Sequence, residues 1–130
     1  GSDPATKATT RSFVGATGAP VGSGAEGPYF SVFSEATRER VFWFEINGDY
    51  IEPVLTPAPG TTITYHPVTL AASLPESDIA LAVSIVIDAT GFFDPVTIDL
   101  ANEMIIRPLL VGSLPSGRND YTAPAGTGTV

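Results

Sequence analysis

The chain contains no cysteine, which excludes disulfides, a thiolate nucleophile and a zinc–thiolate site. It contains one histidine, His66, so a zinc or copper site is disfavoured as well. A Ser–His–Asp catalytic site would depend on this histidine, and none of the serines lies in a G-x-S-x-G motif. His66 is followed by Pro67, a pair more typical of a turn than of a general base. We therefore expect a protein that is not an enzyme.

Positive charge is scarce. The chain has 6 lysines and arginines against 14 aspartates and glutamates, a formal net charge of −8. An acidic surface repels nucleic-acid phosphates and anionic lipid headgroups, and the apolar runs are too short to span a bilayer. We expect neither nucleic-acid binding nor membrane insertion.

Hydrophobic residues make up 43% of the chain, a value typical of a folded protein. The 130 residues suit one domain. Thirteen glycines and 12 prolines favour many turns and short strands over long helices. Composition therefore predicts a small domain that is rich in strands.

Large apolar side chains concentrate in the middle of the chain. Residues 1–27 are rich in Gly, Ala, Ser, Thr and Pro, and residues 113–130 return to this composition. We predict a flexible N-terminal arm (1–27), a β-sandwich domain (28–112) and a C-terminal tail (113–130). Such arms gain order by lying along a neighbouring subunit, so a homo-oligomer or a complex with a partner protein is expected.

Within the central region, short apolar or alternating segments lie between turn signals. Residues 29–33, 41–46, 50–54, 61–65, 68–70, 96–100 and 104–111 are predicted strands. Seven or eight short strands predict an all-β fold, a two-sheet antiparallel sandwich or jelly roll.

Residues 79–87 fit two patterns. Ser73 and Glu76 match a capping box with Pro75 near the first turn, which predicts a helix. The odd positions from Ile79 to Ile87 are all large and apolar, and the β-branched residues among them favour a strand. We predict a strand, with one helical turn before it.

The segment VFWFEINGDYIEPV predicts a hairpin around Asn47-Gly48, a dipeptide typical of type I′ turns. Pairing across a two-residue turn places one set of side chains in the core: Phe42, Phe44, Ile46, Ile51 and Pro53. The opposite face then holds Trp43 and Tyr50 between the carboxylates Glu45 and Glu52. Such a face suits a protein interface with a polar rim, or a surface on which a sugar ring stacks.

Between residues 88 and 99 lies a loop with two kinds of candidate residue. Asp88, Asp94 and Asp99 are the candidate ligands of a calcium site, because loop carboxylates suit a hard cation. The spacing does not match an EF-hand. Phe92 and Phe93 either close one end of the core or form an exposed contact for a partner.

Two further patterns are weak. Residues 22–27 fit G-x-G-x-x-G, but they lack the preceding strand and following helix that a dinucleotide site requires. A carboxylate pair for glycoside hydrolysis cannot be identified from spacing alone, and an acidic surface is the commoner reason for many carboxylates.

These features together predict a non-catalytic structural or attachment domain. A virion surface or tail component, or a bacterial surface module, fits the composition, so an extracellular or virion-surface location is expected. The alternative is a carbohydrate-binding module that uses the face of Trp43 and Tyr50. No cofactor is expected apart from the calcium ion considered for the 88–99 loop.

Overall fold

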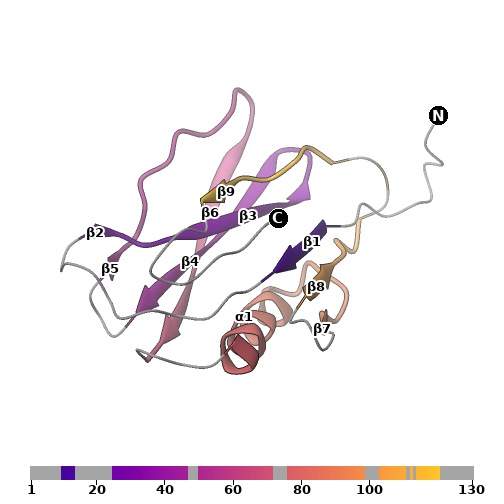
Figure 1. Cartoon of the computed structure of the whole chain (residues 1–130). Coiled ribbons are helices and arrows are strands. Elements are labelled where there is room, and N and C mark those ends of the chain that lie inside the picture. Colours follow the sequence, from indigo (N-terminus) through magenta and orange to yellow (C-terminus); the bar gives the residue numbers. More distant parts are fainter. Residues whose placement is uncertain are drawn as a thin grey trace.

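The computed structural model describes residues 10–13, 25–46, 50–71, 76–98, 103–110, 112 and 114–120. Its largest unit is a four-stranded sheet with the order β6-β4-β3-β9. The bounds of these strands are β3 Tyr29–Glu35, β4 Arg38–Ile46, β6 Thr62–Leu70 and β9 Asn119–Asp120. A β-rich fold is therefore confirmed (Figure 1).

β4 is an interior strand of this sheet. It pairs antiparallel with β3 on one side and parallel with β6, over all nine of its residues, on the other. Side chains alternate between the faces of a strand, and opposite residues share a face. The even-numbered side chains of all three long strands therefore point to one face, and those of Phe30, Phe42 and Val68 lie in the main core there.

The pairing of β4 shows that the predicted hairpin is wrong. Both edges of β4 are occupied by β3 and β6, so no edge is left for the segment that follows. That segment contains β5 (Tyr50–Ile51), which pairs in parallel with β2 (Ala25–Glu26). Asn47 and Gly48 lie outside the described residues.

β6 also differs from its prediction. His66 and Pro67 were expected to end one strand, yet the strand continues from Thr62 through Pro67 to Leu70. Proline removes one ladder donor and is tolerated on an edge strand, where that position can face away from the neighbour. β6 is such an edge strand, so Pro67 interrupts its open edge.

Residues 76–90 form a helix, α1 (Glu76–Thr90), so the predicted strand at 79–87 is wrong. Among the odd positions, Ile79, Val83 and Ile87 are fully buried, whereas Leu81 and Ile85 are exposed. The buried residues are four apart, so they form one stripe along a helix. Because four is an even number, the same residues also fit the alternation of a strand. The helix is followed by Gly91 with a φ of 78°, the left-handed conformation that commonly ends helices.

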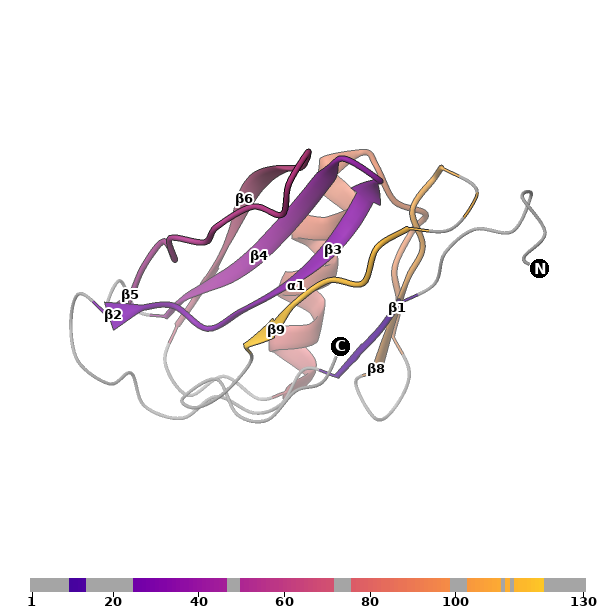
Figure 2. The ribbon, with the colours of Figure 1, turned by 90° about the horizontal axis from the view of Figure 1, so that it is seen from above.

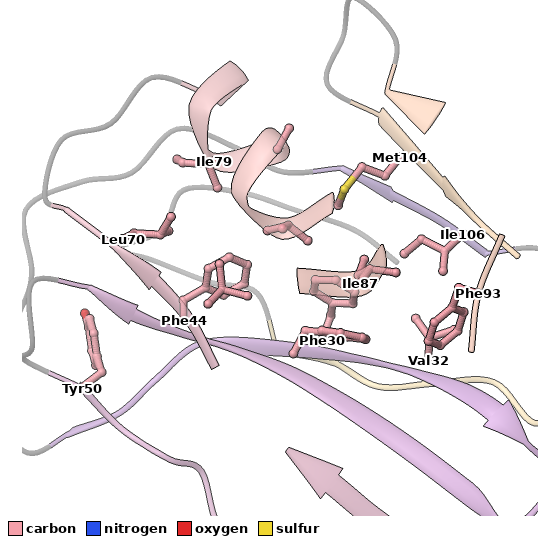
Figure 3. Close-up of a cluster of buried hydrophobic side chains, with 14 residues drawn as sticks. Phe30, Val32, Phe44, Tyr50, Leu70, Ile79, Ile87, Phe93, Met104 and Ile106 are labelled. Carbon is pink, nitrogen blue, oxygen red and sulfur yellow. The ribbon is translucent and has the colours of Figure 1, made fainter. Parts of the chain in front are cut away.

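A small sheet stands beside the helix. It has the order β1-β8-β7 and consists of β1 (Thr10–Phe13), β8 (Glu103–Ile106) and β7 (Thr97–Ile98). Figure 2 shows α1 on one side of the large sheet with β1 and β8 next to it. Met104 and Ile106 from β8 join the side chains of α1 and the large sheet in one core (Figure 3).

The other face of the large sheet is covered by irregular chain. Residues 52–61 run along it, away from α1 (Figure 2), and the backbone N–H of Leu55 donates to the hydroxyl of Tyr65 at 3.0 Å. Val41 is fully buried on this face. β4 is therefore buried on both sides.

Three short strands come from outside residues 28–112. β1 and β2 belong to the range predicted as an N-terminal arm, and β9 belongs to the predicted tail. Each pairs with a strand of the central region. The β-rich part of the predicted fold class is confirmed, α1 is an addition to it, and the described strands do not confirm a sandwich or jelly roll.

Candidate functional site

Trp43 and Tyr50 do not form the predicted exposed face. Trp43 is 7% exposed and lies between β3 and β6, whereas Tyr50 is 6% exposed and belongs to the main core. Their carboxylate neighbours separate as well, since Glu45 is half-buried in β4 and Glu52 is exposed after β5. The faces were misassigned because β5 pairs with β2 instead of β4.

Trp43 is held in place by close packing. The structure records no hydrogen-bond partner for its buried Nε1, in the part of the chain it describes. At Gly27, a Cβ atom would overlap the carbonyl oxygen of Phe44 and lie 3.2 Å from Cε3 of Trp43. The backbone therefore approaches the indole at a position where only glycine fits. These contacts assign Trp43 to packing.

A buried carboxylate, Glu39, lies on the same face of the large sheet as Trp43. Its Oε2 accepts a hydrogen bond from the hydroxyl of Ser31 at 2.6 Å and lies 2.9 Å from Nε of Arg118. The Arg118 guanidinium also donates to Oε1 of Glu39 and to the carbonyl of Thr56. Glu39 and Arg118 together therefore join β3, β4, the 52–61 segment and the C-terminal segment.

The two phenylalanines of the 91–94 turn have different roles. Phe93 is buried in the core, where its ring lies 6.3 Å from that of Phe42. Phe92 is partly exposed, and the guanidinium of Arg40 lies 3.8 Å from the centre of its ring. The first role is the predicted closure of the core, and the second leaves an aromatic ring at the surface.

Arg40 is the centre of a cationic cluster. Its Nε donates to the hydroxyl of Ser34 at 2.8 Å, and its Nη1 lies 3.2 Å from Nε2 of His66. Since a guanidinium has no acceptor, His66 accepts through Nε2 and is neutral in this contact. Arg38 lies next to this cluster on the same face and donates to the hydroxyl of Thr64 at 2.9 Å.

The surroundings shift the pKa values of this cluster downward. Burial, and then the charge of Arg40, lower the pKa of His66, because both disfavour the imidazolium form. Burial and the charge of Arg38 lower the pKa of Arg40, and Glu35 opposes this shift. The guanidinium groups of Arg38 and Arg40 have no carboxylate in ion-pair contact among the described residues.

An apolar groove runs beside this cluster, between β6 and α1. Its volume is about 330 Å³, and it is lined by His66, Pro67, Ile85, Val86, Ala89 and Thr90. Ile85 is exposed at its rim, and Thr90 lies two residues before Phe92. The cluster and the groove together make one surface that is both cationic and apolar, which we call the cationic end (Arg38, Arg40, His66, Ile85 and Phe92).

A second surface lies where β2 pairs with β5. Ile51 and Val54 are exposed there, Val54 to 83%, and so are the carboxylates Glu26 and Glu52. The backbone N–H of Val54 donates to Oε1 of Glu26 at 3.2 Å, which holds the two residues together. We call these four residues the acidic end.

The calcium prediction stays a prediction. Oδ1 of Asp88 accepts a hydrogen bond from the backbone N–H of Val96 at 3.0 Å, and Asp94 is half-buried. Asp99 lies outside the described residues. Within the ranges that the structure covers, no three acidic or histidine side chains form a group that could hold a metal ion.

Comparisons of the chain with models of protein families, with curated proteins and with solved structures found no match. Among the residues described, no helix has both the length and the apolar character needed to cross a bilayer.

The sequence missed most of this site. It singled out Phe92 as a contact and weighed His66 only as a catalytic base, and it did not single out Arg38, Arg40 or Ile85. One signal was available: Arg38 and Arg40 are two of only six basic residues, and they stand two apart in a strand, so they share a face.

Proposed function

We propose that this protein is a non-catalytic structural or attachment domain that assembles with itself or with a partner protein. A virion surface or tail component and a bacterial surface module are the settings that its composition favours. The observation that carries the proposal is the exposure of large apolar side chains next to charged groups, at the cationic end and at the acidic end. Apolar side chains with a charged rim are typical of protein interfaces.

Two other observations support a scaffolding role. The candidate catalytic groups have structural partners: His66 contacts Arg40, and Glu39 is held by Ser31 and Arg118. Segments near both ends of the described chain, β1 and β9, pair with the central strands. Such pairing ties these two segments to the central region.

The carbohydrate-binding alternative has no supporting observation in the structure. Trp43 and Tyr50 are both buried and do not offer flat rings to a sugar. It is kept as an outcome of the test below.

The test is sedimentation velocity of the full chain, from about 1 µM to about 1 mM, a range that covers weak to moderate association. We expect association that weakens in the variant Ile85→Ser, which removes an exposed apolar side chain and leaves the core intact. Fluorescence of Trp43 is followed in parallel during titration with a panel of glycans. A monomer over the whole range whose fluorescence responds to a glycan would contradict the proposal.

A further inference from the structure

We infer that copies of this chain associate head to tail, with the acidic end of one copy seated on the cationic end of the next. This inference rests on the proposed function and specifies both the partner and the surfaces.

The cationic end carries positive charge that the described chain does not neutralise. Arg40 is buried, yet its hydrogen-bond partners, Ser34 and His66, are neutral, and Arg38 next to it bonds to a threonine. Glu35 is the nearby carboxylate that favours the charge of Arg40, and it makes no ion pair there among the described residues. A buried charge without a counterion is unfavourable. Carboxylates from outside would therefore be stabilised at this end.

The acidic end presents the complementary groups. Glu26 and Glu52 have no basic side chain in ion-pair contact, in the part of the chain that is described. Ile51, which pairs with Glu26, and Val54 are exposed at the same surface. These apolar side chains match the exposed Phe92, which packs on Arg40, and the exposed Ile85, which lines the groove beside His66. Each end thus offers one sign of charge together with apolar area to bury.

The two ends lie on different sides of the molecule. Arg38 is the first residue of β4, and at about 3.3 Å per residue the strand separates it from Ile46, which β5 follows, by roughly 25 Å. Val54 lies nearer, next to Leu55, and Leu55 bonds Tyr65 on the face of the sheet opposite Arg40. Figure 1 shows β2 and β5 beyond one end of the large sheet and the β3–β4 turn at the other. One copy cannot pair its own ends, so the contact joins different surfaces of two copies, which produces rings or filaments.

A second copy explains the charge pattern better than other occupants. A nucleic acid at the cationic end would bring its phosphates close to a chain with a net charge of −8. A second copy carries the same net charge of −8, but its acidic end adds the exposed apolar side chains of Ile51 and Val54, which the apolar part of the cationic end can cover.

The test uses two variants of the full chain. Glu52→Lys with Ile51→Ser alters the acidic end, and Arg38→Glu with Phe92→Ser alters the cationic end. Asp78→Lys is the control: it lies at an exposed position of α1 outside both ends and changes the net charge by the same amount as Glu52→Lys. Circular dichroism and thermal unfolding establish that each variant is folded, and sedimentation velocity measures its association.

We expect the wild type and Asp78→Lys to form species larger than a dimer. Each double variant alone should be a monomer, with an apparent dissociation constant raised at least about tenfold. An equimolar mixture of the two variants should form a discrete dimer, because each contributes one intact end.

Three results would overturn the inference: a monomeric wild type, a wild type that stops at a dimer, or double variants that assemble as the wild type does. A monomeric wild type would leave the proposed function possible with a different partner protein. Double variants that assemble as the wild type does would leave it possible with a different surface. Should Phe92→Ser unfold the cationic-end variant, Arg38→Glu alone replaces it. Arg38→Glu must then also abolish assembly, and mixing it with the acidic-end variant must restore a dimer.

Discussion

Gly27 fixes the position of Trp43. Its backbone passes so close to β4 that a side chain would overlap the carbonyl oxygen of Phe44. This contact explains how the indole is buried although its Nε1 has no recorded hydrogen-bond partner. Packing, not polar recognition, therefore stabilises this residue.

Gly27→Ala should lower the free energy of unfolding by about 3 kcal/mol, because the added methyl group meets backbone that cannot move aside. Gly60→Ala is the comparison: its φ of 77° is unfavourable for alanine, but no atom lies within 4 Å, so a loss of about 1 kcal/mol is expected. Urea unfolding measures both losses. Equal losses, or an unchanged Trp43 emission spectrum in Gly27→Ala, would contradict this account.

His66 gives the fold a pH dependence with a defined sign. Its pKa in the folded state is lowered from the ordinary value of 6.5 by burial and by Arg40. The unfolded chain therefore binds a proton more readily, and stability falls as the pH decreases from about 6.5 toward the lowered pKa.

His66→Gln keeps an acceptor for Arg40 and removes the titration. We expect the wild type to lose more stability than this variant between about pH 6.5 and pH 5, a window set by the ordinary pKa of histidine. Urea unfolding at several pH values measures the difference. If stability changes with pH equally in both proteins, or if the wild type becomes more stable relative to the variant as the pH falls, the lowered pKa assigned to His66 is wrong.

At the scale of elements, α1 is where the sequence pattern misled. Alternation over 79–87 treats Ile85 and Ile87 as equivalent, whereas the helix buries Ile87 fully and leaves Ile85 59% exposed. Short apolar stretches carry both periods, and the choice depends on what packs against them. The large sheet supplies one face, which a helix with a single apolar stripe can cover.

Ile87→Ala and Ile85→Ala test the helix directly. Ile87→Ala should cost about 2–4 kcal/mol of unfolding free energy because it leaves a cavity, whereas Ile85→Ala should change it by less than about 0.5 kcal/mol. Chemical denaturation of both variants is the measurement. Similar losses at the two positions would favour the strand that alternation predicts.

The β-strands were easier to predict than their partners. The strands predicted at 29–33 and 41–46 from apolar and β-branched composition lie within β3 and β4, and the burial of Phe42 and Phe44 follows from alternation. The parallel pairing of β4 with β6 could not be inferred, because an Asn-Gly turn favours the local antiparallel partner. Non-local pairing displaced the hairpin, and the predicted face of Trp43 and Tyr50 was lost with it.

At the scale of the whole molecule, charge is unevenly distributed. The net charge is −8, while Arg38 and Arg40 stand together at one end of β4. Repulsion among the carboxylates disfavours the compact state, whereas attraction between the two ends favours contact between copies. Salt weakens both interactions.

Ionic strength should therefore act in opposite directions on folding and on assembly. Raising salt from about 0.05 M to about 0.5 M shortens the Debye length severalfold. We expect a higher melting temperature for the chain at a concentration where it is monomeric, and weaker association by sedimentation velocity. Association that strengthens with salt would show that the repulsion between two chains of net charge −8, which salt screens, outweighs the attraction between the two ends.

The bond between Glu39 and Arg118 also has a consequence for biosynthesis. The two residues are 79 positions apart, and the C-terminal segment that carries Arg118 also bonds the backbone of Ser31 in β3. While the chain is being translated, Glu39 has no counterion and one edge of β3 has no partner. Strands β3 and β4 emerge from the ribosome early, yet they reach their final stability only after residue 118 has been added. A nascent chain halted before Arg118 should therefore remain a target for chaperones and proteases.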